Sequence, residues 1–385
     1  MGKNNVNLND KGGYKIIGIS IGMFVIISAV VLAATYLGVL PKGMIGAFPL
    51  MMVIGAIFNE IGDRTPGIKD FLGGGPIIVI FGSAALVTFK LLPEDSITIM
   101  KDFMTSQAFL DFYIAALITG SILGMDRKLL IRAAVRYLPV ILGGVVTASG
   151  LAGLLGMVLG YGFKEAVLFI AIPIMGGGMG AGAVPLAKIF GEGMKSDPTA
   201  VLSMMVPAVA LGNALSIVAA GILDRIGKGK PRLAGNGKLM VDQEEPEEDT
   251  EEAVPVSYGF MGIGLLLSTA FFVWGSLLAK FIPLHSYALM ILTVAAVKAI
   301  GILPRKYEVA CFQWFRFVMS NLTPTLLVGI GVAYTNLAEV AQALSFTYLA
   351  LVAATVLGAI IGAGIIGKLL GFYPIEASIT GGLCM

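Results

Sequence analysis

Long apolar runs recur along the whole 385-residue chain and limit the folds open to it. A helix crosses the hydrocarbon core of a bilayer with about 20 apolar residues, so runs of roughly 18 or more indicate spanning helices. Charged residues make up 13% of the chain and hydrophobic residues 57%, whereas a soluble domain carries about 25% charged residues. The sequence therefore predicts an all-α polytopic membrane protein. The expected spans are approximately Ile16–Leu40, Met44–Ile61, Pro76–Leu92, Asp111–Met125, Val135–Gly160, Val201–Leu223, Tyr258–Ile282, Ser286–Leu303, Val309–Tyr334 and Phe346–Leu370.

The first apolar run sets the expected orientation. Lys3, Lys11 and Lys15 precede it, and it is too long for the core of a secretory signal peptide and lacks a small-residue cleavage site. Basic residues collect at the cytoplasmic ends of membrane helices. We therefore expect a retained first helix and a cytoplasmic N-terminus.

The composition argues against several classes of chemistry. The two cysteines, Cys311 and Cys384, have no metal-site spacing, and His285 is the single histidine. One histidine is too few for the common hydrolytic, zinc-protease or haem sites, and the sequence has no phosphate-binding P-loop. No basic patch is interleaved with aromatic residues, as nucleic-acid binding would require. We expect a transporter rather than an enzyme, with no catalytic residues, no cofactor and no nucleic-acid partner.

One segment of the membrane region cannot be a continuous helix. Gly176–Leu186 reads GGGMGAGAVPL, and this density of glycine, followed by proline, breaks a helix interior. Within a bilayer, broken backbone persists only where protein buries it or where it lines a watery cavity. We predict a hairpin over about residues 163–193, with Gly176, Gly182 and Pro185 at the break and a ligand site at the tip.

Charge in the flanking loops predicts how this hairpin meets the membrane. The basic stretches 126–136 and 225–232 are both expected in the cytoplasm. Two spans and the glycine segment lie between them, so both stretches share a side only if the glycine segment enters and leaves from one side. The charges therefore favour a re-entrant hairpin that enters from outside, although Lys188 and Lys195 on its return oppose this orientation.

The chain also matches itself at a fixed offset. Tyr137–Ala166 aligns without gaps on Tyr348–Ala377, with 11 of 30 pairs identical, and the same offset of 211, the difference between positions 137 and 348, pairs Pro76–Pro93 with Tyr287–Pro304. The crossings between the two copies give them opposite orientations. Inverted repeats with interrupted helices are typical of secondary transporters, which hold substrate near the bilayer midplane. The partner of the Gly176 motif falls beyond residue 385, so we expect the chain to be a C-terminally truncated part of a longer protein.

Four parts follow from the spans and the repeat. Residues 1–43 are the N-terminal tail and the first transmembrane helix, and residues 44–226 are the first membrane repeat with its hairpin. Residues 227–257 begin basic and become acidic, which is typical of a solvated cytoplasmic linker. Residues 258–385 are the second repeat, which is incomplete.

The glycine motif after Ile172–Met175 (IPIM), the two halves joined by a linker, and the terminal YPIEASITGGLCM resemble the 2-hydroxycarboxylate transporter family of bacteria. The resemblance covers essentially the whole chain. It implies a bacterial plasma-membrane protein that carries citrate, malate or lactate with Na+ or protons, or exchanges them. It also implies eleven helices, two re-entrant hairpins entering from opposite sides, and a homodimer.

The resemblance places ligands on the first hairpin. It implies that Ile174 and Gly177 offer backbone carbonyls to the cation, that Gly180 offers its N–H to a substrate carboxylate, and that Gly178 and Met179 lie at the same site. In sodium-coupled members an asparagine occupies this position, and its side chain contacts both ion and substrate. This chain has Met179 there. Thioether sulfur is a poor ligand for a hard cation. We therefore expect H+ coupling, with Na+ as the alternative and no other metal.

The second hairpin of the family, which completes the site, is missing from this chain. We therefore expect the 385 residues alone not to transport. A rival interpretation is an ion-translocating membrane subunit of a decarboxylase complex, which would need carboxylates within its spans, and no aspartate in the sequence stands out as buried there. An exchanger and a passive channel are further alternatives.

For three polar residues the sequence is compatible with more than one role. Lys298 lies within a span near its cytoplasmic end, where its ammonium group can extend to the interface, or it has a functional role. Asn213 can satisfy broken backbone, contact the hairpin or bind a ligand directly. His285 is expected to lie in an external loop, with a proton relay as the less favoured alternative.

Overall fold

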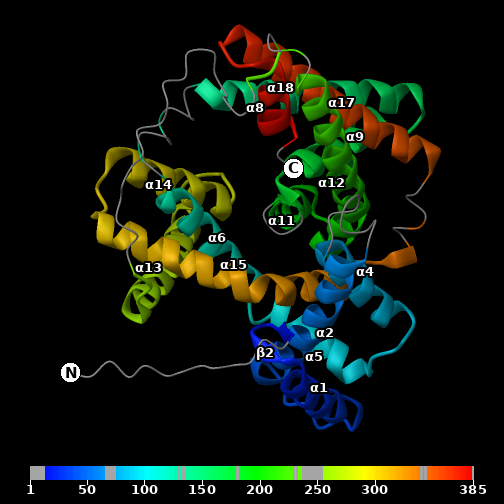
Figure 1. Ribbon diagram of the computed structural model, residues 1–385, viewed down its shortest axis with the longest axis vertical. Coiled ribbons are helices and arrows are strands. Elements are labelled where there is room, and N and C mark those ends of the chain that lie inside the picture. Colours follow the sequence, from blue (N-terminus) through cyan, green and yellow to red (C-terminus); the bar gives the residue numbers. More distant parts are fainter. Residues whose placement is uncertain are drawn as a thin grey trace.

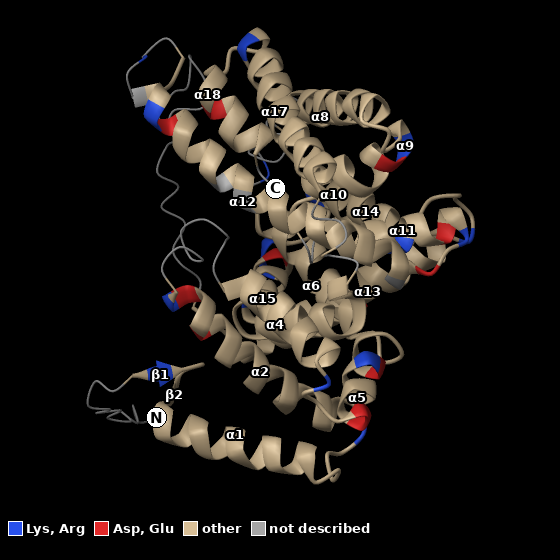
Figure 2. Ribbon diagram, turned by 90° about the vertical axis from the view of Figure 1, so that its right-hand side faces the viewer, with Lys and Arg blue, Asp and Glu red and all other residues tan. Residues whose placement is uncertain are grey.

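The helices form two groups, one around α15 and one around α17 (Figure 1). The computed structural model describes residues 14–65, 75–125, 127, 131, 136–178, 182–228, 230, 233–235, 255–338, 341 and 345–383. Within these ranges, seven helices are long and apolar enough to cross a membrane, and three shorter apolar helices accompany them. Charged residues concentrate at helix ends and loops (Figure 2). The structure thus confirms the predicted all-α polytopic membrane class.

The α15 group has the 30-residue helix α15 at its centre. Close approach depends on small residues, because a Cβ added to Gly264 of α13 would lie 2.3 Å from the Ala310 carbonyl oxygen of α15. The helix α1 (Ile21–Tyr36) packs on α2 at the edge of this group, after the short strands β1 (Lys15–Ile16) and β2 (Ile19–Ser20). The helices of the α15 group are α2 (Met44–Arg64), α4 (Gly75–Thr88), α5 (Glu94–Met104), α6 (Phe109–Gly124), α13 (Tyr258–Leu278), α14 (Ser286–Ile300) and α15 (Arg305–Tyr334).

The α17 group contains the segment 163–193 that was predicted to form a hairpin. Its centre is the packing of α17 on α8, and α12 lies beside this pair. Parts of α11 and α12, including Val184 and Leu202, also belong to the hydrophobic core of the α15 group, so the two groups share an apolar interface. The elements of the α17 group are α8 (Leu138–Val158), α9 (Phe163–Ala166), η2 (Val167–Ala171), α10 (Ile172–Met175), α11 (Val184–Met194), α12 (Pro198–Lys228), α17 (Phe346–Leu369), α18 (Pro374–Ala377) and η4 (Ser378–Gly382).

Elements of the two halves begin and end at positions 211 residues apart. The helices α4 and α14 start at Gly75 and Ser286, and the α9–η2 pair matches the α18–η4 pair at every boundary. Contacts match as well: a Cβ on Gly156 would lie 2.7 Å from the Cβ of Ala166, and one on Gly367 would lie 2.3 Å from the Cβ of Ala377. Sequence similarity at this offset is therefore accompanied by similar local structure.

The predicted spans agree with the helices except at particular places. The first helix is shorter than Ile16–Leu40, because residues 15–20 form the β1–β2 hairpin. The amphipathic helix α5 was not predicted, and it precedes α6 where the second half has the single helix α15.

Most of the predicted linker 227–257 lies outside the described residues. Its described residues include Leu233 and Gly235, which are bound to α18: the Leu233 carbonyl accepts from Ile375 N at 3.1 Å, and Gly235 N donates to Glu376 Oε1 at 2.6 Å.

Candidate functional site

The first arm of the hairpin consists of α9, the π-helical turn η2 and α10. Ile174 in this arm is fully buried and packs with Ile170 and with Ala208 of α12. The approach to α12 is close, since a Cβ added to Gly212 would lie 2.8 Å from Ile174 Cγ1. The arm is therefore held against α12 by direct apolar contact.

The helix breaks at the predicted glycines. Gly176 ends α10, and Gly177 and Gly178 both have φ of +89°, a backbone conformation that disfavours residues with a Cβ. The chain then returns on itself, because a Cβ on Gly182 would lie 2.4 Å from the carbonyl oxygen of Gly176. Gly176 and Gly182 are thus in close backbone contact, which leaves no room for a side chain at Gly182.

The second arm is α11, which follows the glycine break and has Pro185 as its second residue. Proline suits this place because the first N–H groups of a helix have no intrahelical partner. The N-terminal end of α11, which carries the positive end of the helix dipole, therefore faces the glycine break. Such an end attracts an anion, and a carboxylate is one candidate.

The structure places the predicted site residues only in part. Ile174, Gly177 and Gly178 lie on the first arm and at the start of the tip, whereas Met179 and Gly180 lie outside the described residues. On α12, Asn213 follows the glycine that contacts the first arm, and its Oδ1 is buried with no hydrogen-bond partner in the described part of the chain.

A polar cluster connects the second arm to the α15 group, and sequence reasoning missed it. Lys188 Nζ of α11 lies 2.6 Å from Asp111 Oδ1 of α6 and 3.0 Å from the Tyr287 hydroxyl of α14. The Tyr287 hydroxyl also donates to Asp111 Oδ1. Asp111 is half-buried, with 23% of its side chain exposed, and lies in a candidate membrane span.

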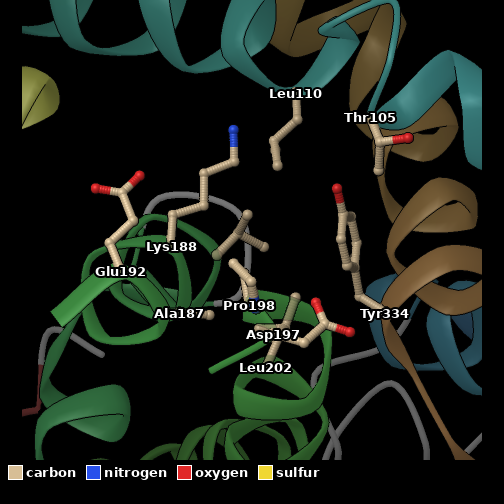
Figure 3. A pocket seen from close by; sticks show the side chains of 10 residues that line it. Thr105, Leu110, Ala187, Lys188, Glu192, Asp197, Pro198, Leu202 and Tyr334 are labelled. Atoms are coloured by element: carbon tan, nitrogen blue, oxygen red, sulfur yellow. The ribbon is translucent and has the colours of Figure 1, made fainter. Parts of the chain in front are cut away.

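This cluster borders a cavity of about 360 Å³ between the two helix groups. In Figure 3, Lys188 points from its helix toward the helix that carries Leu110, and Tyr334 of α15 projects into the cavity from the other side. A signal for the cluster was present in the sequence, because Asp111 and Lys188 are charged residues within apolar segments. Their pairing was not predictable, since they are 77 positions apart.

His285 lies at the start of α14 beside this cluster. Its Nδ1 accepts the backbone N–H of Tyr287 and so caps the helix, while Nε2 lies 3.7 Å from Glu192 of α11. Burial lowers the pKa of His285, the nearby Lys188 lowers it further, and Glu192 and Asp111 oppose the shift. The histidine is therefore a helix cap that contacts the hairpin arm.

Lys298 does not extend to an interface, contrary to the favoured sequence interpretation. Its side chain is 1% exposed, with Nζ 2.8 Å from Glu308 Oε2 of α15 and 3.0 Å from the Leu123 carbonyl of α6. Arg305 also contacts this carboxylate at 3.3 Å. The group thus joins three helices within the α15 group and lies outside the hairpin.

Comparison with known proteins identifies relatives that are named as transporters. The citrate transporter CitP of Leuconostoc mesenteroides subsp. mesenteroides is 34% identical over 370 residues, which cover 96% of this chain and 83% of that protein. The Na(+)-malate symporter of Bacillus subtilis (strain 168) is 34% identical over 94% of this chain and 81% of its own length. The citrate/sodium symporter of Salmonella typhimurium is 35% identical over 97% and 85%, respectively. Since the sequence model of the family also matches residues 16–385, the chain belongs to the 2-hydroxycarboxylate transporter family.

Proposed function

We propose that this protein carries a 2-hydroxycarboxylate, such as malate, citrate or lactate, across the bacterial plasma membrane by alternating access, with H+ as the coupling ion. The observation that carries the proposal is the broken helix between α10 and α11, which brings backbone polar groups into a group of apolar helices. Family membership and relatives named for citrate and malate support the substrate class.

In this proposal the hairpin tip binds both ligands. Gly178, Met179 and Gly180 contact the substrate carboxylate, and Ile174, Gly177 and Met179 contact the cation. The positive end of α11 favours an anion at the tip, and carbonyls released where α10 ends are suited to a cation. Neither ligand requires a charged side chain at the tip itself.

The proposed ion is H+ because Met179 supplies a thioether where sodium-coupled members have an amide. A thioether adds little to a site for a hard cation. Two of the relatives are named as sodium symporters, so Na+ is the alternative ion. Conversion of Met179 to asparagine is expected to increase any dependence on Na+.

Uptake of labelled malate and citrate into proteoliposomes separates these possibilities. We expect the full-length protein to accumulate either substrate under an inward proton gradient in Na+-free buffer. Strict dependence on a sodium gradient would contradict H+ coupling. Uptake only against carboxylate loaded inside the vesicles would indicate an exchanger, and equilibration without accumulation would indicate a passive channel.

We also propose that the two halves, residues 44–226 and 258–385, have opposite orientations, with the N-terminus in the cytoplasm and the hairpin entering from outside. The α17 group then moves against the α15 group, which serves as the scaffold of a homodimer. The shared offset of element boundaries and the division into two helix groups support this arrangement. Labelling of single cysteines from either side of oriented vesicles tests the orientation of each half.

A further inference from the structure

A charged contact joins the second arm of the hairpin to the α15 group. Lys188 Nζ is within 2.6 Å of Asp111 Oδ1 and within 3.0 Å of the Tyr287 hydroxyl, and the aspartate and tyrosine belong to two different helices of the α15 group. The side chains of Lys188 and Asp111 are 29% and 23% exposed. The ammonium group is therefore held by two partners in a partly desolvated position.

The surrounding interface between the groups is apolar. Val184 and Ala187 of α11 and Leu202 and Met205 of α12 belong to the same core as residues of the α15 group. Apolar contact has no preferred direction and is kept when surfaces slide. An ion pair with defined hydrogen-bond geometry is made in one relative position and lost on displacement by a few ångströms.

We propose that Lys188 is a positioning residue that holds the second hairpin arm against the α15 group in this conformation and must separate from Asp111 when the α17 group moves. The inference rests on the proposed alternating access, and it adds the contact that sets the balance between the two states. Tyr287 keeps the Asp111 carboxylate in place for Lys188 through its own hydrogen bond.

The contact between Glu192 and His285 does not replace this pair. Glu192 is 70% exposed and its Oε1 is 3.7 Å from His285 Nε2, and exposed pairs contribute little. Loss of the Lys188–Asp111 pair is expected to lower the ratio of docked to undocked arms by about 3- to 30-fold, as for a partly buried, charge-assisted hydrogen bond.

Distances between spin labels at Gly193→Cys and Ala279→Cys measure this ratio in the purified protein in lipid nanodiscs. Both positions border one cavity between α11 and the α13–α14 loop, and a Cβ at Gly193 meets no atom within 4 Å. The native Cys311 is 1% exposed and out of reach of the label, and Cys384→Ser removes the other thiol. The docked arm gives a short distance between the labels.

We expect Lys188→Gln to raise the ratio of the long-distance to the short-distance population by about 3- to 30-fold. Lys188→Arg should preserve the short distance. The charge-reversed pair Lys188→Asp with Asp111→Lys is expected to restore the short distance that each single reversal loses. Lys195→Gln, which removes an exposed lysine at the end of the same arm, is the matched control and should leave the distribution unchanged.

An unchanged distribution in Lys188→Gln, or an equal shift in Lys195→Gln, would overturn the inference. The label readout needs no substrate, so the two proposals fail separately. Transport with an unaltered distance distribution rejects the role of Lys188 alone. A shifted distribution in a protein that carries no 2-hydroxycarboxylate rejects the proposed function and leaves the contact between the groups established.

Discussion

At the scale of single residues, the hairpin tip depends on the absence of side chains. A Cβ added to Gly182 would lie 2.4 Å from the carbonyl oxygen of Gly176, which is too close for two non-bonded atoms. Gly177 and Gly178 supply the left-handed backbone that turns the chain. Each of these glycines therefore has an identifiable steric or conformational role in breaking the helix.

Replacement of Gly182 by alanine should open this turn. The added methyl group would meet backbone rather than a flexible side chain, so we expect a loss of about 2 kcal/mol of stability and weaker binding of malate or citrate. Gly193→Ala is the control, because that position in α11 has open space and alanine favours a helix. Thermal unfolding with and without carboxylate provides the test, and equal melting temperatures for the two variants would contradict the steric argument.

The buried pair of Lys298 and Glu308 gives a second prediction at this scale. Glu308 is 9% exposed and pairs with Lys298 and with the half-exposed Arg305. Lys298→Met removes the buried partner, and a buried charge that loses its partner costs about 3 kcal/mol of stability. The double variant Lys298→Met with Glu308→Gln should recover part of this loss. Lys280→Met in an exposed loop serves as the control in the same unfolding assay. Additive losses in the double variant would argue against a direct pair.

At the scale of elements, α14 connects the α15 group to α11 through its first residues. His285 caps the helix through Nδ1 and lies against Tyr287, with ring centroids 4.7 Å apart. Only the neutral ring accepts the backbone N–H, because both nitrogens donate when histidine is protonated. The capping and the lowered pKa of His285 therefore favour the same neutral form.

Acidification should destabilise the protein through this histidine. Burial lowers its pKa below the ordinary value of 6.5, so between the two values the unfolded chain binds more protons and stability rises with pH. The contribution is complete above about pH 6.5 and is lost as the pH falls through the lowered pKa. His285→Asn keeps a capping side chain without titrating. We expect a smaller fall in melting temperature between pH 7.5 and 5.5 for this variant than for the natural protein, and an identical fall would exclude His285 as the cause.

The sequence predicted an element well when its apolar residues formed one long uninterrupted run. Long apolar runs marked α8, α13 and α17 within a few residues, since lipid exposure keeps them apolar on all sides. The helix α5 was missed because Glu94, Asp95 and Lys101 keep its sequence from being a continuous apolar run, although Met100 and Phe103 on its apolar face are buried. The glycine break was predictable from local sequence, whereas the Lys188–Asp111 pair depends on how distant helices pack.

At the scale of the whole molecule, the contact between α8 and α17 joins the first half of the chain to the second. A Cβ on Gly362 of α17 would lie 2.4 Å from the Gly143 carbonyl oxygen of α8, and one on Gly358 would lie 2.7 Å from Ala148 Cα. Close packing of small residues is a main source of helix association in lipid. The two helices therefore form the rigid centre on which both the hairpin and α18 are mounted.

Gly362→Ala should separate this centre, because the new methyl group would press on the backbone of α8 and on Thr147 Oγ1 at 2.5 Å. We expect a loss of about 2 kcal/mol and, since both halves depend on the contact, reduced ligand binding even though Gly362 lies outside the hairpin. Gly150→Ala is the matched control on α8, where no atom lies within 4 Å of the added Cβ, and it should be neutral or slightly stabilising. Unfolding and binding measured on both variants decide the matter. If Gly362→Ala lost stability but bound carboxylate normally, the hairpin would be positioned by α12 alone and the α8–α17 contact would be a packing feature without a role in the site.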